Sequence, residues 1–232
     1  QVLAVQAGLL PDFVDASDHL PTLSGHQPHH VRLADFDRDL DVDLIAADQR
    51  AGVLVLSNDG TGRFAEVLGA VVLPAGRNEF FDLAIADLTE DGAPELLLGD
   101  TNPAGTYTQL IVLSNSGGGQ WNPFSSVGVL NSPASLGPQA FDVGDVDDDG
   151  DLDVVVALTG DAPLLFRNDG QARFTHDPAH DVLPQDHVVA PTDVELADVD
   201  GDGDLDLVLA AGRAGLGGFP DVQLFLNGVE FG

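Results

Sequence analysis

Four segments of the sequence place carboxylates at alternating positions, at residues 35–43, 87–95, 145–153 and 198–206. The shared pattern is D-x-D-x-D-G-x-x-D. Carboxylates so closely spaced converge on one point, and like charges that close are unfavourable without a cation. Calcium suits such a loop because it takes about six to eight oxygen ligands in flexible geometry, whereas magnesium prefers a smaller octahedral shell and zinc prefers nitrogen or sulfur. The pattern therefore predicts calcium sites.

The fourth segment carries the pattern in full. We expect side-chain ligands from Asp198, Asp200, Asp202 and Asp206, a carbonyl ligand from Asp204, and a sharp turn at Gly203. An EF-hand is the alternative, but it needs a glutamate at position 12. That position is apolar in every copy: Ala46, Leu98, Val156 and Leu209.

A second element follows each acidic segment after about 20 residues and makes the repeat about 50 residues long. It is a turn built on Asn58, Asn115, Asn168 or Asn227 with a glycine one or two residues on. Such turns join strands because Asn, Asp and Gly tolerate positive φ. The first unit predicts strands near 29–36, 42–47, 52–57 and 62–68, with the acidic loop joining the first two.

Units of four short strands are typical of propeller blades. We therefore expect an all-β fold, a β-propeller built of four-stranded antiparallel blades, with four repeats present. Residues 1–18 are expected to be the end of a preceding blade or ring-closing strands. Because both ends of the chain stop at the same point of the repeat, the four may also be read as a slice of a larger ring or array. The expected blades, within one continuous domain, are 19–70, 71–126, 127–178 and 179–232.

The acidic motif followed by L-x-N-D-G resembles the FG-GAP or VCBS repeat family, which includes the calcium-binding blades of integrin α-subunits. The resemblance covers nearly the whole chain from about residue 28. It implies that loop positions 1, 3, 5 and 9 supply side-chain ligands and position 7 a carbonyl. In the third copy these residues are Asp145, Asp147, Asp149, Asp153 and, for the carbonyl, Asp151.

Two copies depart from this pattern. The first keeps its four ligand aspartates and Asp41 at position 7, but Leu40 replaces the glycine, where a strained turn is expected at a cost of about 1 to 2 kcal/mol. The second has Thr89 and Glu95, with Ala93 at position 7, so it carries fewer charges and is expected to bind calcium most weakly. The remaining expected ligands of these two copies are Asp35, Asp37, Asp39, Asp43, Asp87 and Asp91.

The amino-acid composition excludes several classes of function. The 232 residues include 8 basic and 39 acidic side chains, giving a formal charge of −31. Nucleic acid is a poor partner for that surface. With no cysteine and no lysine, disulfides, thiol catalysis and Schiff-base chemistry are excluded. No apolar run reaches the roughly 18 residues of a membrane-spanning helix.

The function expected is a non-enzymatic extracellular or cell-surface module, stabilised by up to four calcium ions, with an adhesion, structural or matrix role. Its partners would be an extracellular protein, a glycan or other copies of itself. Two alternatives remain open at this point: a carbohydrate-binding module or fragment of a polysaccharide-degrading enzyme, and a calcium-responsive switch. No catalytic residue can be assigned, and the histidines are expected to be exposed or to serve packing. The variable loops on the side opposite the acidic loops are candidates for recognition through Tyr107, Arg213 and Phe219.

Overall fold

The computed structural model describes residues 14–73, 80–101, 108–115, 117–123, 138–158, 162–176, 191–211 and 222–228. Tyr107, Arg213 and Phe219 lie outside these ranges, as do most of the expected residues 1–18. A 3-10 helix, η1 (Ser17–His19), precedes the first strand. No helix in the described part is long and apolar enough to cross a membrane.

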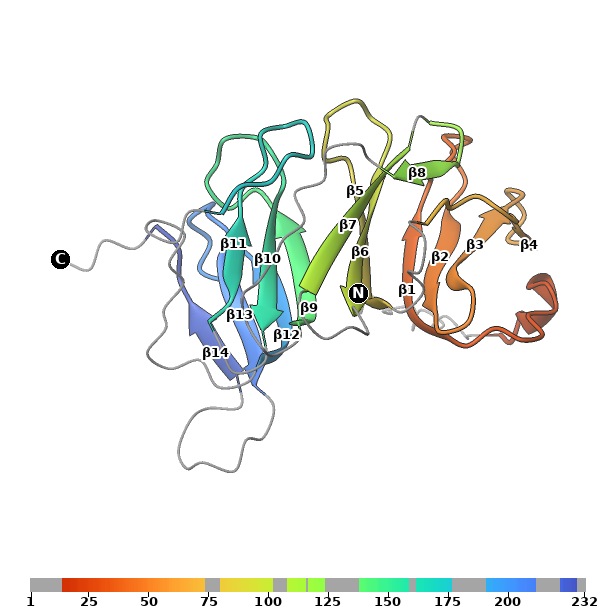
Figure 1. Ribbon diagram of the computed structural model, residues 1–232, viewed down its shortest axis with the longest axis horizontal. Helices are drawn as coiled ribbons and strands as arrows, with labels where there is room; N and C mark the ends of the chain where they lie inside the picture. Colours follow the sequence, from red (N-terminus) through yellow and green to blue (C-terminus); the bar gives the residue numbers. More distant parts are fainter. Residues whose placement is uncertain are drawn as a thin grey trace, which may run out of the picture.

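The described residues form four antiparallel sheets, each ordered as the chain runs (Figure 1). The first contains β1 (Pro28–Ala34), β2 (Asp43–Asp48), β3 (Gly52–Asn58) and β4 (Phe64–Glu66). The second contains β5 (Phe80–Ala86), β6 (Glu95–Thr101), β7 (Thr108–Asn115) and β8 (Trp121–Pro123). The third contains β9 (Pro138–Gly144), β10 (Asp153–Leu158) and β11 (Leu164–Phe166), and the fourth contains β12 (Pro191–Ala197), β13 (Asp206–Ala211) and β14 (Val222–Phe225).

The four strands expected in the first unit are confirmed to within a few residues. Among the described residues, the four strands expected in every unit are present in the first two sheets, and the other two sheets have three strands each. In the third, the fourth-strand position is reduced to a single bridge between Arg167 and Thr175, whose backbone groups exchange two hydrogen bonds of 2.8 Å. In the fourth, the described chain ends at residue 228, soon after β14.

Neighbouring sheets pack face to face, and their first strands are adjacent: β1 contacts β5, β5 contacts β9, and β9 contacts β12. The second strand of each sheet is an almost continuous apolar run, and in the second and third sheets both of its faces are covered by neighbouring sheets. Along β10, Val154 and Val156 face the second sheet while Val155 faces the fourth. The second strands therefore form the centre of the core between the sheets.

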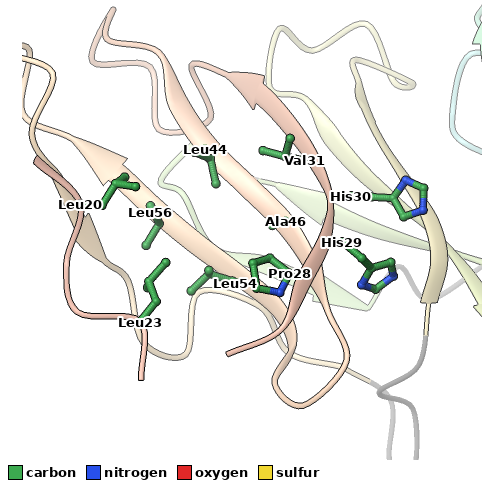
Figure 2. Close-up of a pocket in the computed structure, with 10 residues that line it drawn as sticks. All are labelled: Leu20, Leu23, Pro28, His29, His30, Val31, Leu44, Ala46, Leu54 and Leu56. Atoms are coloured by element: carbon green, nitrogen blue, oxygen red, sulfur yellow. The ribbon is translucent and has the colours of Figure 1, made fainter. Parts of the chain in front are cut away.

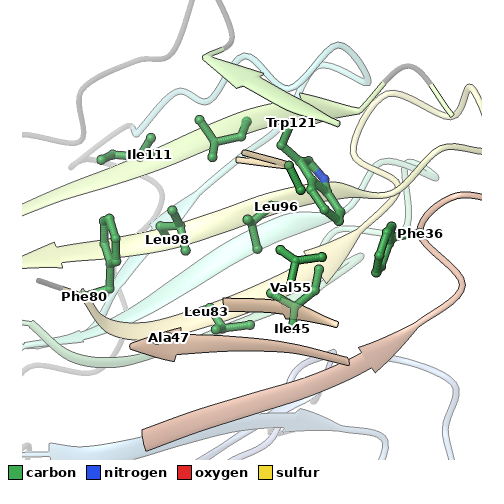
Figure 3. Packing of buried hydrophobic residues seen from close by; sticks show 12 residues of the cluster. Phe36, Ile45, Ala47, Val55, Phe80, Leu83, Leu96, Leu98, Ile111 and Trp121 are labelled. Carbon is green, nitrogen blue, oxygen red and sulfur yellow. The ribbon is translucent and has the colours of Figure 1, made fainter. Parts of the chain in front are cut away.

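The packing between the first two sheets centres on Trp121, which is fully buried (Figure 3). Its ring lies 4.9 Å from that of Phe36, and its indole N–H donates to the carbonyl of Pro94 at 3.2 Å. The backbone of β8 also bonds to the segment after β4, since Trp121 N–H donates to Ala70 at 2.7 Å. The link between the first two sheets thus involves side chains and backbone together.

Hydrogen bonds from asparagine amides also connect neighbouring sheets. The amide of Asn115 donates to the carbonyl of Phe36 at 2.7 Å, that of Asn168 to Leu88 at 2.9 Å, and that of Asn227 to Val146 at 2.9 Å. In each case the asparagine of one turn reaches the second residue of the acidic loop in the preceding sheet. The first sheet has no preceding sheet among the described residues, and Asn58 donates instead to Val42 in its own loop at 3.0 Å.

Replacing Asn168 with alanine should lower the free energy of unfolding by about 0.5 to 1.5 kcal/mol, because the carbonyl of Leu88 would lose this donor and keep only the longer bond from Ala172 N–H at 3.3 Å. Asn58→Ala is the matched control, since Asn58 holds an equivalent turn but makes no bond to another sheet. Urea unfolding at fixed calcium would measure both variants. Equal losses in the two would contradict a role for the bond between sheets.

Candidate metal centres

Each acidic loop joins the first and second strands of a sheet, and its first aspartate shapes it. The two carboxylate oxygens of Asp35 accept from the N–H groups of Asp39 and Leu40 at 3.1 and 3.0 Å. The same pair of bonds recurs at Asp87, where the donors are Asp91 and Gly92, and at Asp145, where they are Asp149 and Gly150. Asp198 accepts from Gly201 and Gly203. The loops are therefore already folded around the carboxylate at position 1.

The carboxylate at position 9 is buried and connects two parts of its sheet. One oxygen of Asp153 accepts from Val146 N–H in its own loop at 3.2 Å, and the other accepts from Asn168 N–H at 2.9 Å. Asp43 and Asp206 make the equivalent bonds, to Phe36 and Asn58 and to Val199 and Asn227 respectively. Position 9 thus ties the acidic loop to the asparagine turn.

Three loops bring three carboxylates together, with one oxygen from each lying within 4.8 Å of the others. The groups are Asp35, Asp37 and Asp39; Asp145, Asp147 and Asp153; and Asp198, Asp200 and Asp206. In the first loop the third member comes from position 5, and in the other two it comes from position 9. A set of hard carboxylate oxygens fits calcium, as the pattern predicts.

The other predicted ligands lie beside these groups. Asp149 and Asp202, at position 5, are exposed and accept N–H bonds from Asp151 and Asp204, both at 3.0 Å. The position-7 side chains of Asp41, Asp151 and Asp204 lie against Gly60, Gly170 and Gly228 of the turns, where a Cβ atom would be less than 3 Å from a carboxylate oxygen. The φ values of these three glycines, 77°, 70° and 70°, lie in the left-handed region and explain why glycine stands there.

Burial and mutual repulsion act on these carboxyl groups. Burial, with smaller contributions from Asp147 and Asp149, raises the pKa of Asp153 to about 6. Burial also raises the pKa values of Asp37, Asp43 and Asp200, and neighbouring carboxylates add to each effect. Ionisation of the carboxyl groups in each cluster is therefore less favourable than in water. A bound divalent cation would stabilise the ionised carboxylates.

The second loop is different. Its residues form none of the three carboxylate groups, and Glu95 Oε2 accepts from Leu88 N–H at 2.9 Å and from the Thr89 hydroxyl at 3.4 Å. Arg38 of the first loop donates to the Asp91 carbonyl at 3.1 Å and pairs with the Asp91 carboxylate at 3.5 Å. A guanidinium thus supplies positive charge at the loop that the sequence predicts to bind calcium most weakly.

The strain expected at Leu40 is confirmed. Leu40 has a φ of 76°, and the glycines at the same position, Gly92, Gly150 and Gly203, have φ values of 81°, 98° and 105°. The leucine side chain is 90% exposed, so no packing compensates for the left-handed backbone. The first loop therefore adopts the conformation of the others at a conformational cost.

Sequence reasoning missed the arginines and the inter-sheet role of the asparagines. Arg167 forms an ion pair with Asp147, one of the third loop's clustered carboxylates, and Arg38 reaches the second loop from the first. The asparagines were interpreted as turn residues alone, although their fixed place after each third strand is the signal that could have indicated a further role. Neither arginine has an equivalent in the other repeats.

The histidines in the described part make packing and polar contacts. His29 hydrogen bonds with the Phe80 carbonyl at 2.8 Å, and His176 bonds with the Leu165 carbonyl at 2.8 Å beside the ring of Phe166. His180 and His187 lie outside the described residues. The three carboxylate groups described above contain no histidine.

Comparison with known families accounts for the repeated loops. The FG-GAP-like repeat matches residues 35–98 and 145–209, which together make up more than half of the chain. The chain belongs to the FG-GAP-like repeat family. Each of the two FG-GAP-like matches spans two acidic loops, together with the second strands that follow them.

No curated protein matches the sequence. Among solved structures, the crystal structure of BBS1N in complex with ARL6DN, soaked with lead, is similar with a TM-score of 0.46 and 14% identity, over 81% of this chain and 51% of that one. The same complex soaked with mercury gives 0.45 and 14%, over 78% and 50%. The FG-GAP-like chain therefore spans about half the length of these matched chains.

Replacing Leu40 with glycine should raise the free energy of unfolding by about 1 kcal/mol, because it removes the left-handed strain, and should tighten calcium binding at the first loop severalfold. Val42→Gly is the control, since Val42 lies in the same loop without a positive φ; there glycine should destabilise by about 0.5 to 1 kcal/mol. Thermal unfolding and calcium titration calorimetry would measure both. A Leu40→Gly protein no more stable than wild type would contradict the strain argument.

The pH dependence of stability should reveal the buried Glu95. Burial raises the pKa of Glu95 to about 7 from a usual value of 4.5, with Asp91 and Asp87 adding to the shift. The folded chain therefore holds this proton more tightly than the unfolded chain, so the stabilisation is full below about pH 4.5 and is lost as the pH rises through 7. In chelator, Glu95→Gln should exceed wild type in stability at pH 8, by on the order of 2 kcal/mol, and lose that advantage at pH 5.

Thermal melts across this pH range would test the effect of Glu95→Gln. Glu90→Gln, in the same loop but at an exposed side chain, should follow wild type at every pH. A Glu95→Gln difference that does not change with pH would contradict a raised pKa.

Proposed function

We propose that the chain is a calcium-stabilised module of a β-propeller that acts outside the cell in adhesion or as a structural or matrix element. The observation that carries the calcium role is the convergence of three carboxylate oxygens in each of three loops. Calcium would be held there by Asp35, Asp37 and Asp39, by Asp145, Asp147 and Asp153, and by Asp198, Asp200 and Asp206. When bound, it would neutralise the loop charge and fix the hairpin.

The propeller part of the proposal rests on how the sheets follow one another. Each sheet places its first strand beside the first strand of the next, and the second and third sheets bury both faces of their second strands against their neighbours. Repetition of that relation about an axis is the arrangement of propeller blades. The described sheets form an open series, and the proposed units are the blades 19–70, 71–126, 127–178 and 179–232.

The extracellular and non-enzymatic parts of the proposal rest on the same loops. Most of the carboxylates in them accept backbone hydrogen bonds that shape a loop or would face a bound cation, so we assign them no catalytic role. Extracellular calcium modules bind with dissociation constants of about 10⁻⁴ to 10⁻³ M, so several weak loops in one chain suit the millimolar calcium found outside cells. A surface carrying a net charge of −31 also suits a well-solvated extracellular protein.

Native mass spectrometry should find three calcium ions per chain at millimolar calcium and none after chelation. Asp145→Asn and Asp198→Asn should each remove one ion, because each takes a charge from one cluster. Asp87→Asn in the second loop is the control and should leave the count at three. A chain that binds no calcium at that concentration would contradict the proposed role of the loops.

A further inference from the structure

Each of the two inner sheets has one apolar face toward the sheet before it and one toward the sheet after it. Leu96 of β6, Val154 of β10 and Leu207 of β13 occupy the same place in the repeat, and each packs against the preceding sheet. The residue that follows each of them faces the other way, as Leu97 and Val155 do in packing against the following sheet. The rule holds at every junction between described sheets.

The first sheet presents a face of this kind, which we call the leading face, and no sheet precedes it among the described residues. It consists of Val31, Leu33, Leu44, Ala46, Leu54 and Leu56. Ala46, Leu54 and Leu56 are buried, with Leu23 packed against them, and the exposed part of the face is formed by Val31 and Leu33. Leu20 and Leu23 also help to line an apolar pocket of about 280 Å³ over this sheet (Figure 2). Leu33, which pairs with Leu44 across the strands, is 63% exposed.

The fourth sheet presents the opposite face, which we call the trailing face. It consists of Val208, Ala210, Val222, Leu224 and Leu226. Val208 pairs with Leu224 and Ala210 with Val222, so these side chains share one side of the sheet. Leu224 is 53% exposed, although the residues at the other face of the same strands are buried in the third core cluster.

The hydrogen-bonding groups beside the leading and trailing faces are also complementary. Every asparagine amide that crosses between sheets meets the carbonyl of loop position 2, and in the fourth sheet that carbonyl belongs to Val199. The described residues include no later sheet to supply an amide to Val199. At the other end Asn58 bonds only within its own sheet, to Val42.

Aspartates in the first strands of the sheets form a second set of hydrogen bonds that link a sheet to the one after it. One oxygen of Asp82 accepts from Leu83 N–H at 2.8 Å, and the other accepts from Phe141 N–H of the next sheet at 3.3 Å. Asp142 likewise accepts from Val143 and, at 2.7 Å, from Leu196 of the next sheet. Asp193 makes the first of these bonds, to Val194 at 3.1 Å. Among the described residues it has no next sheet for the second.

We propose that the trailing face of one copy of this chain docks on the leading face of a second copy. The occupant is a second copy because the two faces are the two halves of an interface that the chain already forms three times. Both the apolar residues and the hydrogen-bonding groups lie at the positions used in those interfaces. The contact would bring the Asn58 amide of one copy to the Val199 carbonyl of the other.

A contact between different faces generates a ring when its rotation closes and a filament when it does not. Two copies with four sheets each would place eight sheets around one axis, and propellers close with about four to eight blades. The expected assembly is therefore a closed dimer. This inference goes beyond the proposed function, since both faces lie on the sheets and outside the acidic loops.

Sedimentation velocity on the whole chain in calcium and moderate salt, which screens the repulsion between two acidic copies, would test the proposal. Wild type should sediment as a dimer. Leu33→Asp on the leading face and Leu224→Asp on the trailing face should each be monomeric at the same concentration. Leu68→Asp adds the same charge at a residue that is 82% exposed and belongs to neither face, so it should remain dimeric.

Mixing the two monomeric variants gives the decisive result. Leu33→Asp retains an intact trailing face and Leu224→Asp an intact leading face, so the mixture should form heterodimers that neither variant forms alone. Larger oligomers of wild type, abolished by both variants, would support the same contact with a rotation that does not close at two copies. A monomeric wild type, or a mixture that stays monomeric while circular dichroism shows both variants folded, would overturn the proposal.

The calcium count from mass spectrometry is independent of these masses. A chain that binds calcium but never associates would overturn this inference and leave the proposed function standing. A chain that associates through these faces without binding calcium would do the reverse.

Discussion

The buried carboxylate at the ninth position of each acidic loop is the interaction on which the other features depend. It accepts one N–H from its own loop and one from the turn after the third strand, as Asp153 does with Val146 and Asn168. Removing a charge from water is costly unless it is paired, and these hydrogen bonds compensate only part of that cost, since burial still raises the pKa of Asp153 to about 6. A bound cation would supply the rest. In the third and fourth loops, where this carboxylate belongs to the cluster, the loop, the turn and the metal site are in this sense one unit.

The same turn carries the contact between sheets. While the backbone N–H of Asn168 meets the buried carboxylate of its own sheet, its side-chain amide donates to Leu88 in the sheet before. A metal that fixes the loop therefore also fixes the residue that holds the neighbouring sheet. This coupling accounts for how a chain crowded with like charges can keep its sheets in register.

Much of this arrangement is predictable from the sequence because it repeats. The spacing of the acidic loops and the Asn-Gly turns gave the strands of the first sheet, and the absence of glycine at Leu40 gave its strained backbone. The inter-sheet amide bonds could not be predicted, because a single asparagine in a turn has a sufficient local explanation. Arg38 and Arg167 could not be placed either, since each occurs once and its partner lies on a loop distant in sequence. The reduced fourth strand of the third sheet departs from the repeat and was missed for the same reason.

Hydrogen exchange of the loop amides, with calcium and with chelator, tests the central claim most directly. Calcium should slow exchange in the loops at 35–43, 145–153 and 198–206 and at the backbone N–H groups of Asn58, Asn168 and Asn227, which their buried carboxylates hold. The loop at 87–95 and the N–H of Asn115 should change far less, because Arg38 already provides a positive charge there. Uniform protection of all four loops, or protection of none, would contradict the account.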